Sequence, residues 1–133
     1  MSIIESKSIL VVDDDAMVAK ALDLLLSMEG HLVETAGDGE TALAKYDGVG
    51  YDLVIADFLL PGIDGLELAR LIRARNPRQR VLLVTAHSET VSGREQGRLK
   101  HVDAMLAKPF YVEELHEVLR AMFPPGGSKT VEG

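Results

Sequence analysis

An apolar run, Leu53-Val54-Ile55-Ala56-Asp57, ends on a carboxylate and is followed by a turn at Pro61-Gly62. A second run, Ile9-Leu10-Val11-Val12, ends on three acids, Asp13-Asp14-Asp15. In an open parallel sheet the carboxyl ends of the strands meet at one edge, which is where such sheets bind ligands. Carboxylates that converge there repel each other unless a cation neutralises them. The two runs therefore predict a cation site at the end of a parallel sheet.

Two later runs end on residues that suit a phosphoryl group. Thr85 closes Val81-Leu82-Leu83-Val84, and Lys108 closes Met105-Leu106-Ala107. A hydroxyl can donate a hydrogen bond to a phosphoryl oxygen, and a lysine ammonium is a compact point charge for the same oxygen. Together with Asp13, Asp14 and Asp57, these residues form a set suited to holding a metal ion and a phosphoryl group.

Size and composition limit the classes of function. The chain has 133 residues, of which 47% are apolar, enough for one domain with one core. A formal charge of −7 argues against a nucleic-acid-binding surface, and the absence of cysteine excludes disulfides and thiolate metal sites. The apolar runs are too short to span a membrane, and residues 1–7 lack a secretory pattern. We expect a cytoplasmic protein that does not contact membranes.

Strand-like runs alternate with helical patterns along the chain. The predicted strands are Ser8–Val12, Leu32–Ala36, Leu53–Asp57, Arg80–Thr85 and Ala104–Ala107. The predicted helices are Ala16–Met28 with Asp15 as N-cap, Glu40–Tyr46, a helix capped by Asp64 that runs to Arg75, Ser88–His101, and Val112–Phe123. Residues 1–123 are expected to form one domain. Residues 124–133, which begin Pro124-Pro125-Gly126-Gly127, are expected to form a flexible tail or linker.

Five strands alternating with five helices predict an α/β fold, a doubly wound parallel sheet with helices on both faces. Right-handed crossovers restrict the topology, and the expected strand order is 2-1-3-4-5, as in flavodoxin-like folds. That order places the first and third strands side by side. It would bring Asp13, Asp14 and Asp57 together.

These segments resemble the receiver domain of two-component response regulators. The likeness rests on four stretches, Ile9–Asp15, Asp57–Gly65, Val84-Thr85-Ala86 and Lys108-Pro109-Phe110, each at the end of a predicted strand. It covers about residues 8–123. Each stretch alone is a weak signal, but all four in this order are specific.

The resemblance implies that Asp57 is phosphorylated. The phosphoryl group would come from a sensor histidine kinase or a histidine phosphotransfer protein. It implies a magnesium ion held by Asp14, Asp57 and the Leu59 carbonyl, with Asp13 acting mainly through water. Thr85 and Lys108 would bind phosphoryl oxygens, and the Lys108-Pro109 bond would be cis. Such a domain catalyses only its own phosphotransfer and dephosphorylation. It would signal through the face formed by Ser88–His101, Ala104–Ala107 and Val112–Phe123, a face that could also form a homodimer.

Several positions depart from the family pattern. The resemblance assigns the conformational switch to Thr85 and to the position of Met105, where receivers often carry an aromatic residue, and methionine lacks the ring that packs inward. Leu59 stands where a polar residue is frequent and offers no hydrogen bond to orient a hydrolytic water. His87 could lie over the opposite rim of the site. Leu59 and His87 are therefore expected to lengthen the lifetime of the phosphorylated state.

The individual residues have plainer explanations. Asp13-Asp14-Asp15 could simply cap a helix, Asp57 could be a turn residue, and Lys108 could be a surface lysine. The four histidines, His31, His87, His101 and His116, show no metal-ligand spacing and are expected at the surface.

Two other functions stay open on the sequence. A phosphatase of the haloacid dehalogenase type also uses an aspartate nucleophile, a threonine, a lysine and magnesium. However, Met17 stands where that family carries threonine or valine, and no acidic pair follows Lys108. A degenerate receiver that acts only as an interaction domain is the other alternative, and the intact acidic set argues against it.

Overall fold

Five parallel strands form one sheet in the computed structural model, which describes residues 4–86, 97 and 99–124. The order across the sheet is β2-β1-β3-β4-β5, as the sequence predicts. The strands also have the predicted bounds: β1 Ser8–Val12, β2 Leu32–Ala36, β3 Leu53–Asp57, β4 Arg80–Thr85 and β5 Ala104–Ala107.

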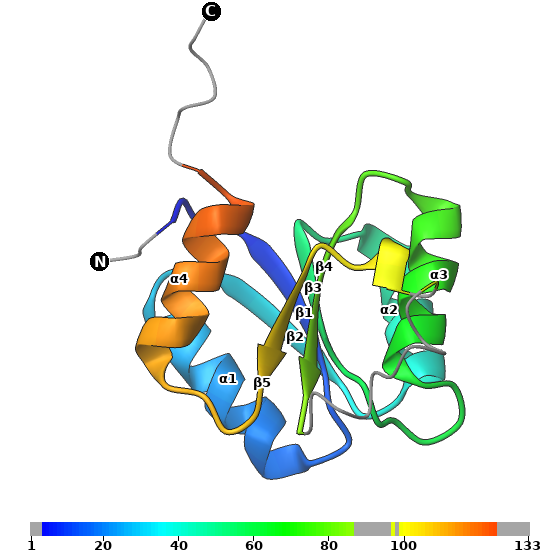
Figure 1. The fold of residues 1–133 in the computed structure, drawn as a ribbon, viewed down its shortest axis with the longest axis horizontal. Coiled ribbons are helices and arrows are strands. Elements are labelled where there is room, and N and C mark those ends of the chain that lie inside the picture. The colour runs from blue at the N-terminus through cyan, green and yellow to red at the C-terminus, as the bar shows by residue number, and fades with distance from the viewer. Residues whose placement is uncertain (1–3, 87–96, 98, 125–133) are drawn as a thin grey trace, which may run out of the picture.

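The helices cover both faces of the sheet (Figure 1). Helices α1, Ala16–Met28, and α4, Val112–Met122, lie on one face, and helices α2, Gly39–Val49, and α3, Gly65–Arg75, lie on the other. Alternate strand residues supply the two cores, because successive side chains of a strand point to opposite faces. Ile9 and Val11 pack under α1 and α4, whereas Leu10 and Val12 pack under α2 and α3. The doubly wound fold is therefore confirmed.

Aspartates cap the first three helices. The carboxylate of Asp15 accepts from the main-chain N–H groups of Met17 and Val18, Asp38 accepts from Thr41, and Asp64 accepts from Glu67. Each cap satisfies an N–H group that has no partner within the helix. At the other end of α1, Gly30 has a φ of 96°, a left-handed conformation that favours glycine. The predicted N-cap of α1 is confirmed.

Helix α2 is longer than the sequence pattern predicts. It runs from Gly39 to Val49 rather than from Glu40 to Tyr46, and it ends where Gly50 turns at a φ of 76°. Glycine at position 48 weakens a helix by about 1 kcal/mol relative to alanine. The last turn is nevertheless closed by the main-chain N–H of Gly50, which donates to the carbonyl of Tyr46 at 2.8 Å.

The sequence predicts two helices after β4, at Ser88–His101 and Val112–Phe123. The helix predicted at Ser88–His101 falls mostly outside the described residues, and its described part includes a 3₁₀ turn at residues 99–101. Helix α4 ends at Met122, one residue before the predicted end, with Phe123 as its C-cap. Within the described ranges, no helix combines the length and the apolar character needed to cross a bilayer.

The prediction that the histidines lie at the surface is wrong for His31, which is 4% exposed. Its Nδ1 accepts a hydrogen bond from the main-chain N–H of Lys7, and burial lowers the pKa of the ring, which favours its neutral form. His116 is half-buried on α4, with its Nε2 2.7 Å from a carboxylate oxygen of Glu29. His87 lies outside the described residues.

Candidate functional site

Three carboxylates converge at the carboxyl edge of the sheet. Val12 of β1 pairs with Ala56 of β3, so Asp13 and Asp57, the next residue of each chain segment, lie side by side. A carboxylate oxygen from each of Asp13, Asp14 and Asp57 lies within 4.8 Å of the other two. The strand order therefore produces the acidic cluster that the sequence predicts.

Lys108 completes the cluster. Its Nζ donates to Oδ2 of Asp13 at 2.9 Å and lies 3.5 Å from Oδ2 of Asp57. The Asp13 side chain is 4% exposed, and it also accepts from the main-chain N–H of Asp15 at 2.9 Å. A buried carboxylate is stable only when it is paired and hydrogen-bonded, and both conditions hold here.

The surroundings shift the pKa values of two groups. Burial raises the pKa of the Asp57 carboxyl, and the charges of Asp13 and Asp14 add to that effect while Lys108 opposes it. Burial alone would lower the pKa of the Lys108 ammonium. Its bond to Asp13 and the charge of Asp57 outweigh burial, so the Lys108 pKa is raised and the ammonium stays charged.

Three negative charges and one positive charge leave the cluster with an excess of two negative charges when all four groups are ionised. A divalent cation would neutralise that excess, and hard cations such as Mg²⁺ prefer oxygen ligands. Asp14 is exposed and Asp57 is partly exposed, so an ion could reach both from solvent. The donor set fits magnesium on grounds of charge and ligand type.

Thr85 ends β4, next to β3, and is buried. Its main-chain carbonyl accepts from the N–H of Lys108 at 2.8 Å, so Thr85 and Lys108 are joined at the edge of the sheet. The Lys108-Pro109 peptide bond is cis, as the resemblance implies.

The other predicted site residues surround this cluster. Leu59 follows β3 at the same edge and is 60% exposed. Met105 is half-buried and packs against a small cluster of Phe58, Leu66 and Leu83. His87 is not among the described residues, so its position relative to the site stays a prediction.

Sequence reasoning missed one contact, the ion pair between Lys108 and Asp13. The sequence indicates that both residues end strands of one sheet, but β1 and β5 are separated by β3 and β4. At about 4.8 Å between neighbouring strands, the two strands lie about 14 Å apart. Strand order alone therefore gives no reason to pair them.

The chain is similar to known proteins of one family. A family profile described as response regulator receiver domain matches residues 9–120. The transcriptional regulatory protein TcrA of Mycobacterium tuberculosis is 41% identical over 114 residues, which cover 86% of this chain and 45% of TcrA. The response regulator ArlR of Staphylococcus aureus is 38% identical over 117 residues, which cover 86% of this chain and 51% of ArlR. The chain thus spans about half the length of these relatives.

Solved structures show the same likeness. The response regulator TrrA of Thermotoga maritima, in complex with Mg²⁺ and BeF, matches with a TM-score of 0.80 and 38% identity. The match covers 88% of this chain and 99% of TrrA. The chemotaxis protein CheY4 of Vibrio cholerae matches with a TM-score of 0.79 and 28% identity, over 87% of this chain and 98% of CheY4.

Proposed function

Because the chain belongs to the receiver-domain family of two-component response regulators, we propose that Asp57 accepts a phosphoryl group. The donor would be a phosphohistidine on a sensor histidine kinase or on a histidine phosphotransfer protein. The observation that carries the proposal is the convergence of Asp57 with Asp13, Asp14 and Lys108 at one edge of the sheet. In this proposal, residues 1–123 form the receiver unit and residues 124–133 a tail or linker in a cytoplasmic protein.

The proposed transfer assigns a task to each residue. An oxygen of the ionised Asp57 carboxylate attacks phosphorus, a new O–P bond forms, and the N–P bond of the phosphohistidine breaks. Lys108 and the Thr85 hydroxyl would then bind phosphoryl oxygens. Asp14, Asp57 and the Leu59 carbonyl would hold magnesium, with Asp13 acting through water. The bound ion would stabilise the negative charge of the transferring group.

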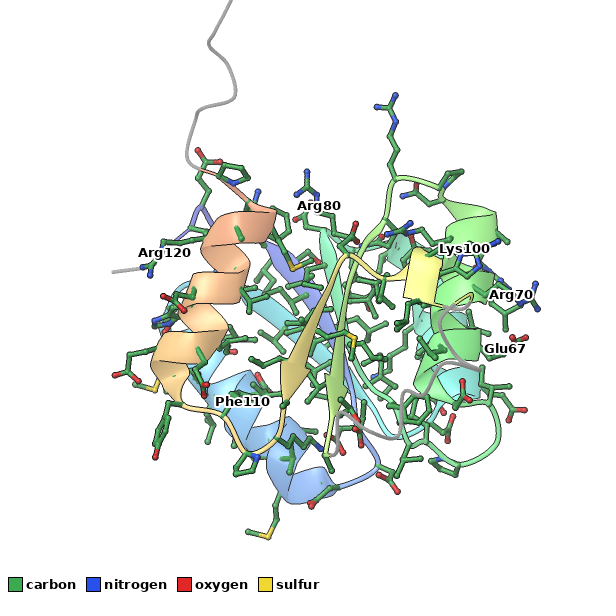
Figure 2. The ribbon with its side chains drawn as sticks, in the orientation of Figure 1. Glu67, Arg70, Arg80, Lys100, Phe110 and Arg120 are labelled. Atoms are coloured by element: carbon green, nitrogen blue, oxygen red, sulfur yellow. The ribbon has the colours of Figure 1, made fainter. Side chains whose placement is uncertain are left out.

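A groove beside the site is the surface we assign to the partner. Its volume is about 700 Å³, and its mostly apolar lining comes from α1 and from the connection between β5 and α4. Phe110 lies on that connection next to α1 (Figure 2). The groove reaches Lys108, so a helix of the partner that lies in it would hold its phosphohistidine near Asp57.

The proposed output runs through the face that the resemblance assigns to residues 88–101, β5 and α4. Leu83 pairs with Met105, and Thr85 lies two residues after Leu83, on the same side of the sheet. A change in the Thr85 side chain can therefore reach Met105 through Leu83, which packs in the same cluster. A homodimer through this face is part of the proposal.

The direct test is phosphorylation by a small donor. With acetyl phosphate and magnesium, the protein is expected to gain the mass of a single phosphoryl group, and with a chelator it should gain none. Intact-mass spectrometry measures the gain. A protein that stays unmodified would contradict the proposal, and sustained turnover of p-nitrophenyl phosphate would favour the phosphatase alternative.

Asp14→Ala should weaken magnesium binding. The wild type is expected to bind the ion with a dissociation constant on the order of millimolar, because few protein ligands are present and the ion keeps several waters. Loss of the Asp14 carboxylate should raise that constant by about tenfold or more. Titration followed by NMR chemical shifts measures it. Asp47→Ala removes the same charge from an exposed position on α2 and should bind like the wild type. Unchanged binding in Asp14→Ala would refute the ligand assignment.

Leu59→Asn should shorten the lifetime of the phosphorylated state. Asparagine can orient a water for attack on phosphorus, whereas leucine cannot. The hydrolysis rate is measured as the loss of radiolabel from purified phosphoprotein with magnesium present. Adding His87→Glu to Leu59→Asn should increase this rate further. Leu32→Asn makes the same change at an exposed position on β2 and is the control. Equal decay in the wild type and the double variant would show that these side chains do not set the lifetime.

A further inference from the structure

The connection between β3 and α3, residues 58–64, follows Asp57 and ends at a buried glycine. Gly65 is the first residue of α3, and its N–H donates to the carbonyl of Phe58 at 2.8 Å. A Cβ atom at Gly65 would overlap the carbonyl oxygen of Asp57 and lie 3.0 Å from its carbonyl carbon. It would also lie 3.0 Å from Cδ1 of Leu83. Helix α3 therefore starts in direct contact with the peptide group of Asp57.

A second glycine supports the same connection from α2. Gly39, the first residue of α2, is buried. A Cβ atom there would overlap Cγ1 of Ile63 and lie 2.6 Å from its Cδ1. Ile63 belongs to the connection and packs against the core under α2 and α3. Ile63 thus occupies the space that a side chain at position 39 would need.

Backbone conformation does not explain these two glycines. Gly30, Gly50 and Gly62 have positive φ angles, but Gly39 and Gly65 do not. Glycine also weakens a helix relative to alanine, so helix formation gives no reason for it either. What remains is the lack of a side chain, which lets the connection approach both helices closely.

We propose that Gly65 and Gly39 are positioning residues that hold Asp57 and the connection after it in place for phosphoryl transfer. The inference rests on the proposed function of Asp57. Strand β3 is paired on both sides, through Ala56 with Val12 and through Asp57 with Val84, so its end resists displacement. At position 65 an added methyl group would have to move the connection, shift the start of α3 or tilt the Asp57 peptide, because it meets backbone atoms. At position 39 it would have to turn the Ile63 side chain or shift the connection that carries it. A displacement of about 1 Å at a reacting group can cost a factor on the order of a hundred in rate.

The experiment compares Gly65→Ala and Gly39→Ala with a matched control, Gly37→Ala. Gly37 lies in the same β2–α2 turn as Gly39, has no positive φ, and has open space where a Cβ would stand. The control should bind magnesium and take up phosphoryl groups from acetyl phosphate like the wild type. The two test variants, checked for a native fold by circular dichroism, should bind magnesium about tenfold more weakly and react about tenfold to a hundredfold more slowly.

Rescue separates positioning from loss of stability. Ile63→Ala removes the two atoms that a side chain at position 39 would meet, so Gly39→Ala combined with Ile63→Ala should recover magnesium affinity, even though Ile63→Ala lowers stability by itself. The clash at Gly65 involves backbone, so Ile63→Ala should not restore Gly65→Ala. If Gly65→Ala does not fold, the comparison of Gly39→Ala with the Gly39→Ala and Ile63→Ala double variant tests the inference.

The inference would be overturned if folded Gly39→Ala and Gly65→Ala proteins bind magnesium and react within about twofold of the wild type, since such a change is small against the expected effect. The proposed function of Asp57 would still stand. Failure of the double variant to recover would also overturn the role of Gly39. A wild type that takes up no phosphoryl group would overturn the proposed function and this inference with it.

Discussion

The Asp57→Asn variant is expected to take up no phosphoryl group from acetyl phosphate, whereas the wild type takes up a single one. The amide lacks the anionic oxygen that attacks phosphorus. We expect no neighbouring carboxylate to replace it, because Asp13 is engaged by Lys108 and Asp14 is assigned to the metal ion. Intact-mass spectrometry before and after the reaction measures uptake. Asparagine has nearly the shape of aspartate and removes one of the three repelling charges, so the variant should fold.

The matched control lies at the opposite end of the same segment. Asp52 comes just before β3 and accepts a hydrogen bond from the main-chain N–H of Ser8 at 2.9 Å, at the other edge of the sheet. Asp52→Asn keeps an oxygen that can accept this bond, so it should be phosphorylated like the wild type. Equal labelling of Asp57→Asn and the wild type would refute the assignment of Asp57.

Lys108→Ala should separate phosphorylation from the conformational response. Lys108 can leave Asp13 for a phosphoryl oxygen, and this difference in contacts stabilises one conformation over the other. Without it, beryllofluoride and magnesium should cause few NMR shift changes in residues 88–101 and in β5, although the site still binds them. The variant should stay folded but lose about 1–3 kcal/mol of unfolding free energy, since the buried Asp13 loses its charged partner.

Lys100→Ala is the control for this experiment. Lys100 is an exposed lysine in the turn before β5 and lies next to α3 (Figure 2). It precedes the amino end of β5, whereas the acidic cluster lies at the carboxyl ends of the strands. Its removal should leave the shift changes of the wild type intact. Wild-type changes in Lys108→Ala would count against the proposed coupling, and loss of changes in both variants would show that the effect is not specific to Lys108.

The sheet and the acidic cluster could be predicted from the sequence because their signals are local. The three inner strands, β1, β3 and β4, are short, largely buried apolar runs, so their bounds follow from composition, as Leu53–Asp57 shows. Asp15 and Gly30 fix the ends of α1 through their own backbone chemistry. Once the strand order is known, Asp13 and Asp57 must be neighbours.

What the sequence did not predict depends on contacts between distant residues. His31 is buried because a main-chain group 24 residues away donates to its ring. The partner of Lys108 lies 95 residues away, across two strands. Position 65 requires glycine because the carbonyl group of Asp57 leaves no room for a side chain there. The glycine at the start of the helix was visible in the sequence, but this contact was not. Each of these features is set by tertiary packing, which local sequence patterns do not encode.

The ion pair between Lys108 and Asp13 has a consequence for how the protein would process a signal. Asp13 is both the resting partner of the ammonium and a member of the proposed magnesium site. If Lys108 moves to a phosphoryl oxygen, the buried Asp13 carboxylate needs another positive charge nearby. Under the proposed function, the full response therefore requires phosphoryl group and metal together. In the language of circuits, the site is an AND gate, and neither input alone switches it.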